Sequence, residues 1–271
     1  MWWRRCLAVA LILASAVVAR ATCSAQEASD KLLYPRGWEL GYEVEYFDYE
    51  EPTVDIGMDG IMHALHAQYT FRPGGKSGAV LSADGRLSGG TLEYQGRTWG
   101  GTPLEQDHDD AVVEFQGIAG NDFQVSTNAR ITVFVGLGRR YWNDEPSNGS
   151  GYEREIAYLY SPIGIEVAGT NGRDWSIAVR GEYDVFWDGE VMTHLSDVGY
   201  SDVTNNQDSG YGTRASVEVS RNLGHGFLAI RLFFRYWDID KSDLQFSGRG
   251  TWSYEPENTT KESGLQVSYH F

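Results

Sequence analysis

Apolar and polar residues alternate along most of this chain of 271 residues. In the last eight residues, GLQVSYHF, every second position is apolar up to the final Phe271. Successive side chains of a β-strand point to opposite faces, so this pattern predicts strands with one apolar and one polar face. The segments that show it are 37–49, 59–71, 78–90, 111–119, 123–142, 152–169, 175–187, 211–220, 227–237 and 264–271. The pattern therefore predicts an all-β chain.

The connections between these segments fall into two classes. The short ones are rich in Gly, Asn and Asp, as β-hairpin turns require, and lie at 72–77, 120–122, 170–174 and 222–226. The longer ones are polar and mostly acidic, and lie at 50–58, 91–110, 143–151, 188–210 and 238–262. Short turns at one end and long loops at the other are typical of a transmembrane β-barrel. We therefore predict an antiparallel transmembrane β-barrel of ten strands. The alternative is eight strands, if 78–90 and 111–119 belong to a long excursion.

The apolar faces have the composition of a surface that contacts lipid. Their central positions are Val, Ile, Leu and Ala, and their ends carry aromatic residues. Aromatic rings prefer the zone between hydrocarbon and water, so we expect two aromatic girdles. The turn-side girdle is predicted to contain Trp38, Phe71, Phe123, Trp175, Phe227, Tyr269 and Phe271, and the loop-side girdle Tyr46, Tyr141, Trp142, Tyr183, Tyr211 and Tyr236.

The first 25 residues have the features of a secretory signal peptide. Two arginines precede an apolar run at 7–19, which is too short to cross a bilayer. We expect cleavage after Ala25, with cleavage after Ala21 as the alternative. The remaining chain would comprise a short N-terminal segment at 26–36 and a barrel at 37–271.

Composition narrows the classes of function further. Both cysteines, Cys6 and Cys23, lie in the predicted leader, so we expect neither a disulfide nor thiolate chemistry in the mature chain. The formal net charge is −16, and removal of the leader's arginines makes it more negative. This charge argues against a nucleic acid as a partner.

The chain resembles Gram-negative outer-membrane β-barrel proteins over its whole mature length. The residues that carry the resemblance at the C-terminus are Leu265, Val267, Tyr269 and Phe271, which are similar to the signal by which the barrel-assembly machinery recognises its clients. Chain size and strand number are similar to those of the omptin surface proteases, but the sequence does not contain the omptin catalytic motifs. The resemblance implies a location in the cell outer membrane, contact with its lipid and lipopolysaccharide, periplasmic termini and extracellular long loops.

The polar faces carry charges of both signs. The acids predicted to face inward are Glu39, Glu43, Glu45, Asp84, Glu114, Glu166, Glu182, Asp184 and Glu218, and the arginines are Arg86, Arg130, Arg140, Arg154, Arg180, Arg214, Arg231 and Arg235. All four lysines lie outside the predicted strands. Arginine presents a rigid fork of donors that binds two carboxylates at once, so we expect a salt-bridged network that plugs a narrow barrel. The alternative is a charged constriction that selects solutes.

Two sets of residues are candidates for catalysis. His194 and Ser196 form a His-x-Ser pair in the fourth long loop. The spacing is similar to that in outer-membrane lipid A deacylases, where a histidine activates a serine. An omptin-like site needs acids and a histidine near one rim. Those residue types are supplied by 107–110 (DHDD), Asp48, Asp55 and Asp59.

The acidic loops also offer carboxylate oxygens to divalent cations, although the sequence contains no twelve-residue calcium loop. His63 and His66 are three residues apart, which places them on opposite faces of a strand and makes them poor partners for one metal ion. We predict no cofactor and no defined metal site.

The first functional hypothesis is a non-enzymatic integral outer-membrane β-barrel protein, structural or surface-interacting, with a plugged lumen. The alternatives are a small porin-like solute channel and an outer-rim enzyme.

Overall fold

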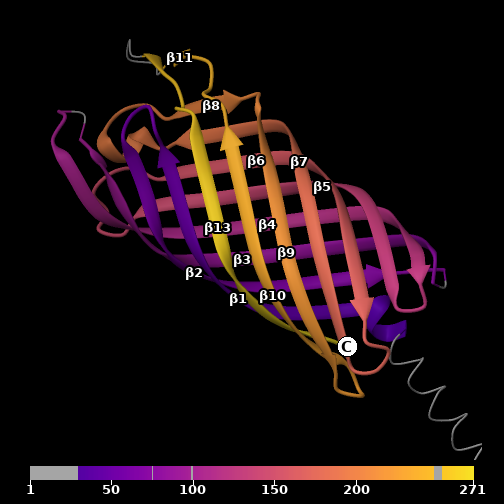
Figure 1. The fold of residues 1–271 in the computed structure, drawn as a ribbon. Coiled ribbons are helices and arrows are strands. Elements are labelled where there is room, and N and C mark those ends of the chain that lie inside the picture. The colour runs from indigo at the N-terminus through magenta and orange to yellow at the C-terminus, as the bar shows by residue number, and fades with distance from the viewer. Residues whose placement is uncertain (1–29, 75, 99, 247–251) are drawn as a thin grey trace, which may run out of the picture.

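The computed structural model describes residues 30–74, 76–98, 100–246 and 252–271, which form a closed antiparallel β-barrel (Figure 1). The signal peptide predicted at 1–25 lies outside the described residues. The strands of the wall are β1 (Gly37–Glu51), β2 (Ile56–Phe71), β3 (Gly78–Arg97), β4 (Pro103–Ser126), β5 (Ala129–Pro146), β6 (Arg154–Thr170), β7 (Trp175–Thr193), β9 (Gly210–Asn222), β10 (Phe227–Ile239) and β13 (Asn258–His270). The predicted ten-stranded barrel is confirmed.

The wall strands pair with their neighbours around a complete ring. β6 pairs with β7 at one point of the ring, and β13 lies between β1 and β10 at another. In this last seam Leu40 lies opposite Tyr269, and Val44 lies opposite Leu265. The first and last strands therefore close the barrel against each other. β3 and β4 pair along the whole length of β3, so the eight-stranded alternative is wrong.

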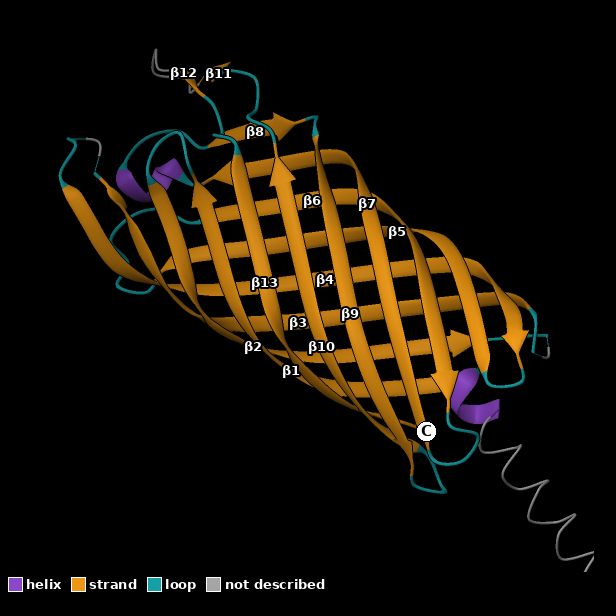
Figure 2. Ribbon diagram, in the orientation of Figure 1, coloured by secondary structure: helices purple, strands orange, loops and turns teal. Residues whose placement is uncertain are grey.

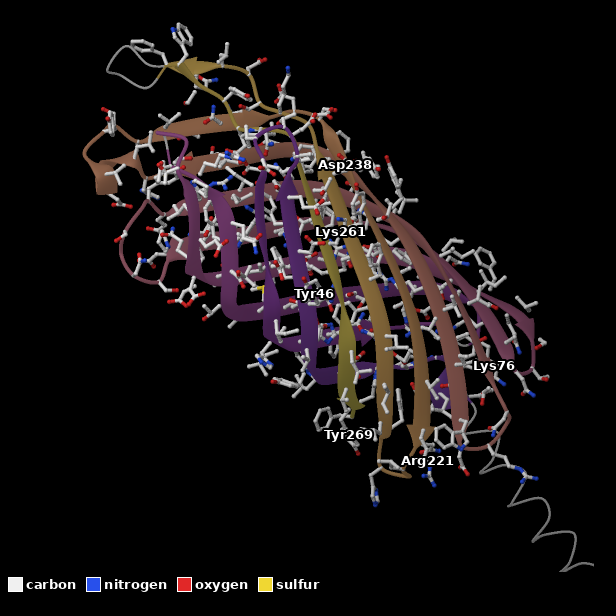
Figure 3. All side chains as sticks on the ribbon, turned by 60° about the vertical axis from the view of Figure 1, so that its left-hand side comes forward. Tyr46, Lys76, Arg221, Asp238, Lys261 and Tyr269 are labelled. Atoms are coloured by element: carbon white, nitrogen blue, oxygen red, sulfur yellow. The ribbon has the colours of Figure 1, made fainter. Side chains whose placement is uncertain are left out.

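The outer wall carries the predicted apolar faces. Leu65, Val135 and Ile177 are 64%, 52% and 51% exposed. Charged side chains lie toward the two ends of the wall, with Lys76 at the turn end and Asp238 at the loop end (Figure 3). An apolar band between charged ends is the pattern of a barrel surface that contacts hydrocarbon.

Two predictions about the aromatic girdles are wrong. Phe227 and Trp142 are only 8% and 1% exposed, because both side chains point into the barrel. Phe227 stacks on His270 with ring centroids 4.1 Å apart. Their neighbours Leu228 and Tyr141 take the outward positions, as the alternation along each strand requires.

The strands extend further toward the loop end than predicted. β3 and β4 continue through most of the predicted loop at 91–110. Outward residues there, such as Asp107 and Asp109, are exposed and polar, so the apolar alternation stops while the strand pairing continues. The predicted bounds of the long loops are therefore wrong. The connections at this end are 52–55, 98–102, 147–153, 194–209 and 240–257.

The predicted turn at 120–122 is also wrong. β4 continues through this Gly-Asn-Asp sequence to Ser126, and the turn is formed by Thr127 and Asn128. The physical reason is Asp122, whose side chain lies inside the barrel at 2% exposure. It accepts hydrogen bonds from Arg72 Nε at 2.8 Å and Thr132 Oγ1 at 2.6 Å. These bonds hold Asp122 in a strand, although its sequence context is typical of a turn.

Two smaller features concern β6 and β13. β6 has a bulge between Leu159 and Tyr160, where the register against β7 shifts. Lys261 was placed outside the strands, but it lies on the outer wall in β13, 3.2 Å from Glu50. Acidic neighbours on β1 therefore pair with this lysine.

Short elements occupy the two ends of the barrel (Figure 2). The connection 194–209 contains the 3-10 helix η1 (Leu195–Val198) and β8 (Val203–Gln207), which pairs with β7. The connection 240–257 contains the short pair β11 (Gln245–Phe246) and β12 (Trp252–Ser253). At the turn end, residues 30–33 form a single helical turn. Within the described residues, no helix has the length and apolar character needed to span a membrane.

Candidate functional site

The interior of the barrel is built in four layers, and β1 passes through all of them. From the turn end to the loop end, its inward side chains are Glu39, Glu43, Glu45, Phe47, Tyr49 and Glu51, and none is more than 3% exposed. Glu39 borders a cavity, and Glu43 and Glu45 belong to a charge network. Phe47 and Tyr49 belong to an apolar layer, and Glu51 belongs to a cluster of acids. The strand alternation alone places these six residues on one inward line.

The second layer is a central charge network. We define it by Glu43, Glu45, Arg86, Glu114, Arg140, Glu182, Asp184, Arg214, Arg235 and Glu262. Arg86 is 4% exposed and lies 2.7 Å from Glu45 and 2.9 Å from Glu262. Arg235 reaches Glu43 at 3.1 Å and Glu45 at 3.0 Å. Arg86 therefore joins carboxylates of β1 and β13, whereas Arg235 joins two carboxylates of β1.

Glu262 is the acid that connects most of this network. Its carboxylate is fully buried and lies 2.9 Å from Arg86, 2.5 Å from Arg140 and 3.3 Å from Arg235. These arginines come from β3, β5 and β10, so one carboxylate on β13 links strands across the barrel. A charge-assisted hydrogen bond is stronger than a neutral one, and its strength increases further where water is excluded.

Arg214 anchors the other side of the central charge network. Its Nε atom donates to Asp184 at 2.6 Å, and its guanidinium pairs with Glu114 and Glu182. Glu114 also accepts a hydrogen bond from the Tyr160 hydroxyl at 2.6 Å. The network therefore spans the barrel from β1 to β9.

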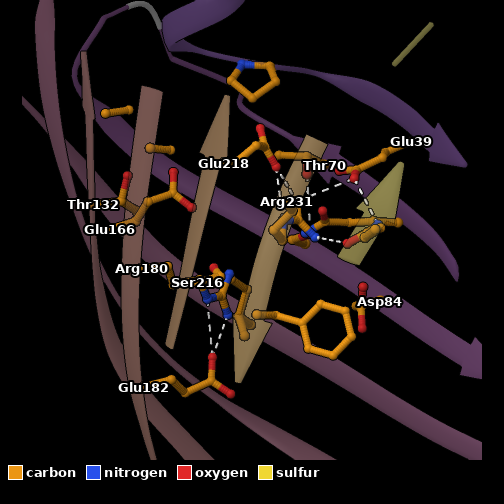
Figure 4. Close-up of a pocket in the computed structure, with 18 of the residues that line it drawn as sticks. Glu39, Thr70, Asp84, Thr132, Glu166, Arg180, Glu182, Ser216, Glu218 and Arg231 are labelled. Carbon is orange, nitrogen blue, oxygen red and sulfur yellow. Dashed lines mark hydrogen bonds and ion pairs between the residues drawn. The ribbon is translucent and has the colours of Figure 1, made fainter. Parts of the chain in front are cut away.

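The first layer is a polar cavity of about 170 Å³ on the turn side of the central charge network (Figure 4). Arg231 donates to Glu218 at 2.6 Å and to Gln266 at 2.7 Å, and its guanidinium lies 3.3 Å from Glu39. Arg180 lies beside Glu182, with 2.6 Å between the charged atoms. The predicted inward residues of this region thus bind one another around the cavity.

His66 and Asp84 form a further pair in the wall of the cavity. His66 is 6% exposed. His63 points to the outer wall, where a hydrogen bond of 2.7 Å joins its Nδ1 atom to the Tyr42 hydroxyl. The prediction that the two histidines lie on opposite faces is therefore confirmed.

Residues from the N-terminal segment cover the turn-end mouth of this cavity. Leu33 and Tyr34 are 1% and 5% exposed. Arg130 donates to the carbonyl oxygen of Leu33 at 2.5 Å and pairs with Glu166 at 2.6 Å. Leu33 and Tyr34, which belong to the short N-terminal segment predicted at 26–36, are therefore anchored inside the barrel.

The third layer is apolar, which the sequence reading missed. Its largest buried members are Phe47, Tyr49, Met58, Met62, Leu92, Trp142, Ile156, Tyr158, Tyr160 and Trp237. The rings of Tyr160 and Trp237 meet edge to face at 5.0 Å. Arg214 lies 5.5 Å from the centre of the Trp237 ring, so this layer rests directly on the central charge network.

The fourth layer is the loop-end acid cluster, which we define by Glu51, Asp110, Asp144 and Glu255. Arg154 pairs with Glu51 at 3.1 Å and with Glu255. His108 pairs with Asp144, and Trp142 Nε1 donates to Asp110 at 2.5 Å. All four acids are buried.

Burial changes the protonation of this cluster, which lies beyond the apolar band. Burial, together with the neighbouring Asp144 carboxylate, raises the pKa of Asp110 to about 8. Burial likewise raises the pKa of Glu255 to about 7, against the opposing effect of Arg154. Each of these two carboxyl groups therefore gains or loses its proton near neutral pH.

The His-x-Ser pair is not arranged for nucleophilic catalysis. His194 precedes η1, and its Nε2 atom lies 3.4 Å from Glu155 rather than at Ser196. Ser196 is exposed, and its backbone N–H donates to Asp202 at 2.8 Å. Among the described residues, no hydrogen bond joins His194 to Ser196, so the activation that the candidate pair would need is not present.

The acids named for an omptin-like site are dispersed. Asp48 and Asp59 lie on the outer wall, where they meet Lys261 and Tyr46. Asp55 pairs with Arg97 in an exposed connection. Of the sequence 107–110, the alternation turns only His108 and Asp110 inward. These groups do not form one site.

The C-terminal residues lie on the outer wall. Leu265, Val267 and Phe271 are 42%, 43% and 66% exposed, and the rings of Tyr269 and Phe271 meet at 5.0 Å. Their role as an address for the assembly machinery stays a prediction.

Several interior residues were missed by the sequence reading, although a signal existed for them. Glu262, Asp110 and Asp144 continue the inward faces of β13, β4 and β5, but they lie beyond the predicted strand ends. Extending the alternation by one or two steps would have found them.

Similarity to solved structures is consistent with this architecture. OmpT, the outer membrane protease from Escherichia coli, superposes with a TM-score of 0.54 at 12% identity, covering 88% of this chain and 98% of OmpT. The translocator domain of the autotransporter NalP from Neisseria meningitidis gives 0.41 at 12% identity, covering 95% and 97%. Neisserial surface protein A gives 0.35 at 11%, covering 87% and 97%. No protein-family model and no curated protein matches the chain. The chain thus has the fold of an outer-membrane β-barrel, as the OmpT match shows.

We expect Glu262→Gln to destabilise the barrel by roughly 3–5 kcal/mol, because it removes the charge that Arg86, Arg140 and Arg235 share. Glu257→Gln, at an exposed position close by in the chain, is the control and should change stability by less than about 0.5 kcal/mol. The two variants are compared by their free energy of unfolding in urea, measured in lipid vesicles. Equal effects of the two substitutions would contradict the role of Glu262.

The stability of the loop end should fall as pH rises from 5 to 8. The pKa of Asp110 is raised in the folded state, so the folded protein binds this proton more tightly than the unfolded chain, and stability is lost as the proton leaves. Asp110→Asn should flatten the pH dependence of unfolding. Asp107→Asn, on the exposed face of the same strand and not among the charges that shift Asp110, should leave it unchanged. If the free energy of unfolding had the same slope against pH in both variants, the role of Asp110 would be refuted.

Proposed function

We propose that this protein is a non-enzymatic integral outer-membrane β-barrel with a sealed lumen, which presents its loop end at the cell surface as a structural or interacting element. The observation that carries the proposal is the occupied interior. The central charge network and the apolar layer fill successive levels of the barrel with side chains from its own wall.

The apolar outer band supports insertion in a membrane. Side chains such as Leu65 and Leu232, which are 64% and 61% exposed, would be unfavourable in water as part of a continuous band. A closed barrel leaves no unpaired strand edge, which satisfies the backbone in hydrocarbon. The OmpT-like fold supports the same environment.

The interior argues against the channel alternative. A steady ion path would need continuous water through both the central charge network and the apolar layer. The buried arginines already bind carboxylates at salt-bridge distance, and the apolar layer contributes Phe47, Trp142 and Trp237, each at most 1% exposed. The arginines and carboxylates lose their bound water in this interior, and their ion pairs with one another offset that cost.

The loop end also argues against a rim enzyme. OmpT is named as a protease, but in this chain the titratable groups of the loop-end acid cluster are covered. His108 is 5% exposed, and it binds Asp144 instead of facing a substrate. Described residues of the long connections 194–209 and 240–257, such as Ser201 and Glu257, are exposed at this end, and such loops commonly carry surface contacts.

Planar-bilayer recording tests the sealed lumen. The purified protein should insert without steady conductance, and Arg235→Ala should give at most brief, small openings, because the rest of the network and the apolar layer remain. A stable conductance whose ion selectivity changes in Arg235→Ala would overturn the proposal and favour the channel.

Cysteine labelling tests the orientation, because the chain has no cysteine after residue 23. Ser201→Cys in the connection 194–209 should react with a membrane-impermeant maleimide on intact cells. His225→Cys, in the exposed turn between β9 and β10, should react only after the outer membrane is permeabilised. The reverse pattern would show that the loop end faces the periplasm.

A further inference from the structure

The start of β6 and the end of β7 bring two glutamates and a histidine together on the outer wall, at the loop end of the barrel. The last paired residues of these strands are Arg154 and Thr193. The backbone N–H of His194 then donates to the carbonyl of Glu153 at 2.9 Å, which extends the ladder by one step. Directly opposite residues of an antiparallel pair share a face, so His194 lies on the same face as Glu153. Glu155, two residues along β6, lies on this face as well.

The ligand atoms of these three side chains converge. One imidazole nitrogen and one oxygen from each carboxylate all lie within 4.8 Å of one another. His194 Nε2 and Glu155 Oε1 are 3.4 Å apart. Bonds of about 2.0–2.1 Å to a tetrahedral zinc ion place neighbouring ligand atoms about 3.3–3.4 Å apart, which fits this separation.

Apart from its 3.4 Å approach to Glu155, His194 Nε2 has no recorded polar contact among the described residues. The atom is shielded from solvent and has no hydrogen-bond partner among the described residues. A buried polar atom without a partner costs free energy unless a ligand satisfies it. Two neighbouring carboxylates on one strand face also repel each other, and a bound cation would offset both costs.

We propose that Glu153, Glu155 and His194 form a binding site for a divalent transition-metal ion of the zinc type, with a fourth position open to water. The imidazole favours zinc over calcium, because calcium takes six to eight oxygen ligands and these side chains supply only part of such a shell. This inference goes beyond the proposed sealed barrel and does not depend on it.

Neighbouring groups hold the ligands in place. Asn143 Nδ2 donates to Glu153 Oε1 at 2.5 Å, which orients that carboxylate. Asp202 Oδ2 lies 4.0 Å from His194 Nδ1, on the side of the ring away from the proposed ion. This distance is too long for a hydrogen bond, but it places a carboxylate on the side of the ring where the outer-shell partner of a metal-binding histidine commonly lies. Asp202 is itself held by the backbone N–H of Ser196.

The site would tie the loop-end connection to the barrel wall. Glu153 and Glu155 belong to the start of β6, whereas His194 begins the connection that contains η1 and β8. The backbone N–H of Glu153 also donates to Asp197 in η1 at 3.2 Å. An ion held by all three ligands would therefore fix the position of this connection on the outer wall.

Equilibrium dialysis of the folded protein against zinc chloride in detergent micelles tests the proposal, with protein purified without a polyhistidine tag. The wild-type protein should bind one zinc ion per chain. His194→Ala and Glu155→Gln should each weaken binding by about 100-fold or more, because even loss of an outer-shell partner costs about 10–100-fold. The matched control His225→Ala, at an exposed histidine in the turn between β9 and β10, should bind as the wild type does.

Heat-modifiable gel mobility establishes that each variant is folded, and Glu155→Gln keeps the test valid if His194→Ala fails to fold. A large excess of calcium should not displace the zinc. Absence of zinc binding to the wild type, unchanged binding in the folded His194→Ala variant, or displacement of zinc by calcium would each overturn the proposal.

Discussion

The structure depends on the cost of placing charges in the closed interior of a narrow ring. An arginine or a carboxylate that leaves water must find partners of opposite charge, because an unpaired buried charge costs several kcal/mol. Arg86, Arg140 and Arg235 meet this requirement by sharing Glu262, which joins β13 to the distant strands β3 and β5 and to its neighbour β10. The strands can therefore adopt this ring only in the register that brings these groups together.

The central charge network also explains the layers on either side of it. Toward the loop end, Arg214 and Arg140 lie against the rings of Trp237 and Phe47, so the apolar layer begins where the charges are already satisfied. Toward the turn end, Arg231 binds Glu218 and Gln266 around a small polar cavity. Water that enters from either end meets a filled level, which is why we favour a sealed barrel over a channel.

The loop end differs chemically from the rest of the interior. Acids outnumber their basic partners there, and burial raises the pKa of Asp110 and of Glu255 toward neutrality. On the outer wall at the same end, Glu153, Glu155 and His194 form the proposed metal site. Glu255 lies in the connection 240–257 and His194 in the connection 194–209, so a proton on Glu255 and a cation at the proposed site would each act on a connection at the loop end.

The sequence by itself determined the ten strands, their two faces and most of the inward charges, because the two-residue period of a strand is a local property. Only the tertiary structure decided which charges meet, since pairing across the ring joins residues such as Glu45 and Arg235 that no local pattern relates. It also decided where strands end: Asp122 stays in β4 because Arg72 and Thr132 bind it inside the barrel, against the local preference for a turn. The apolar layer depends on the closed ring for the same reason. Its side chains occupy the polar-face positions of strands, and only closure of the wall around them removes those positions from water.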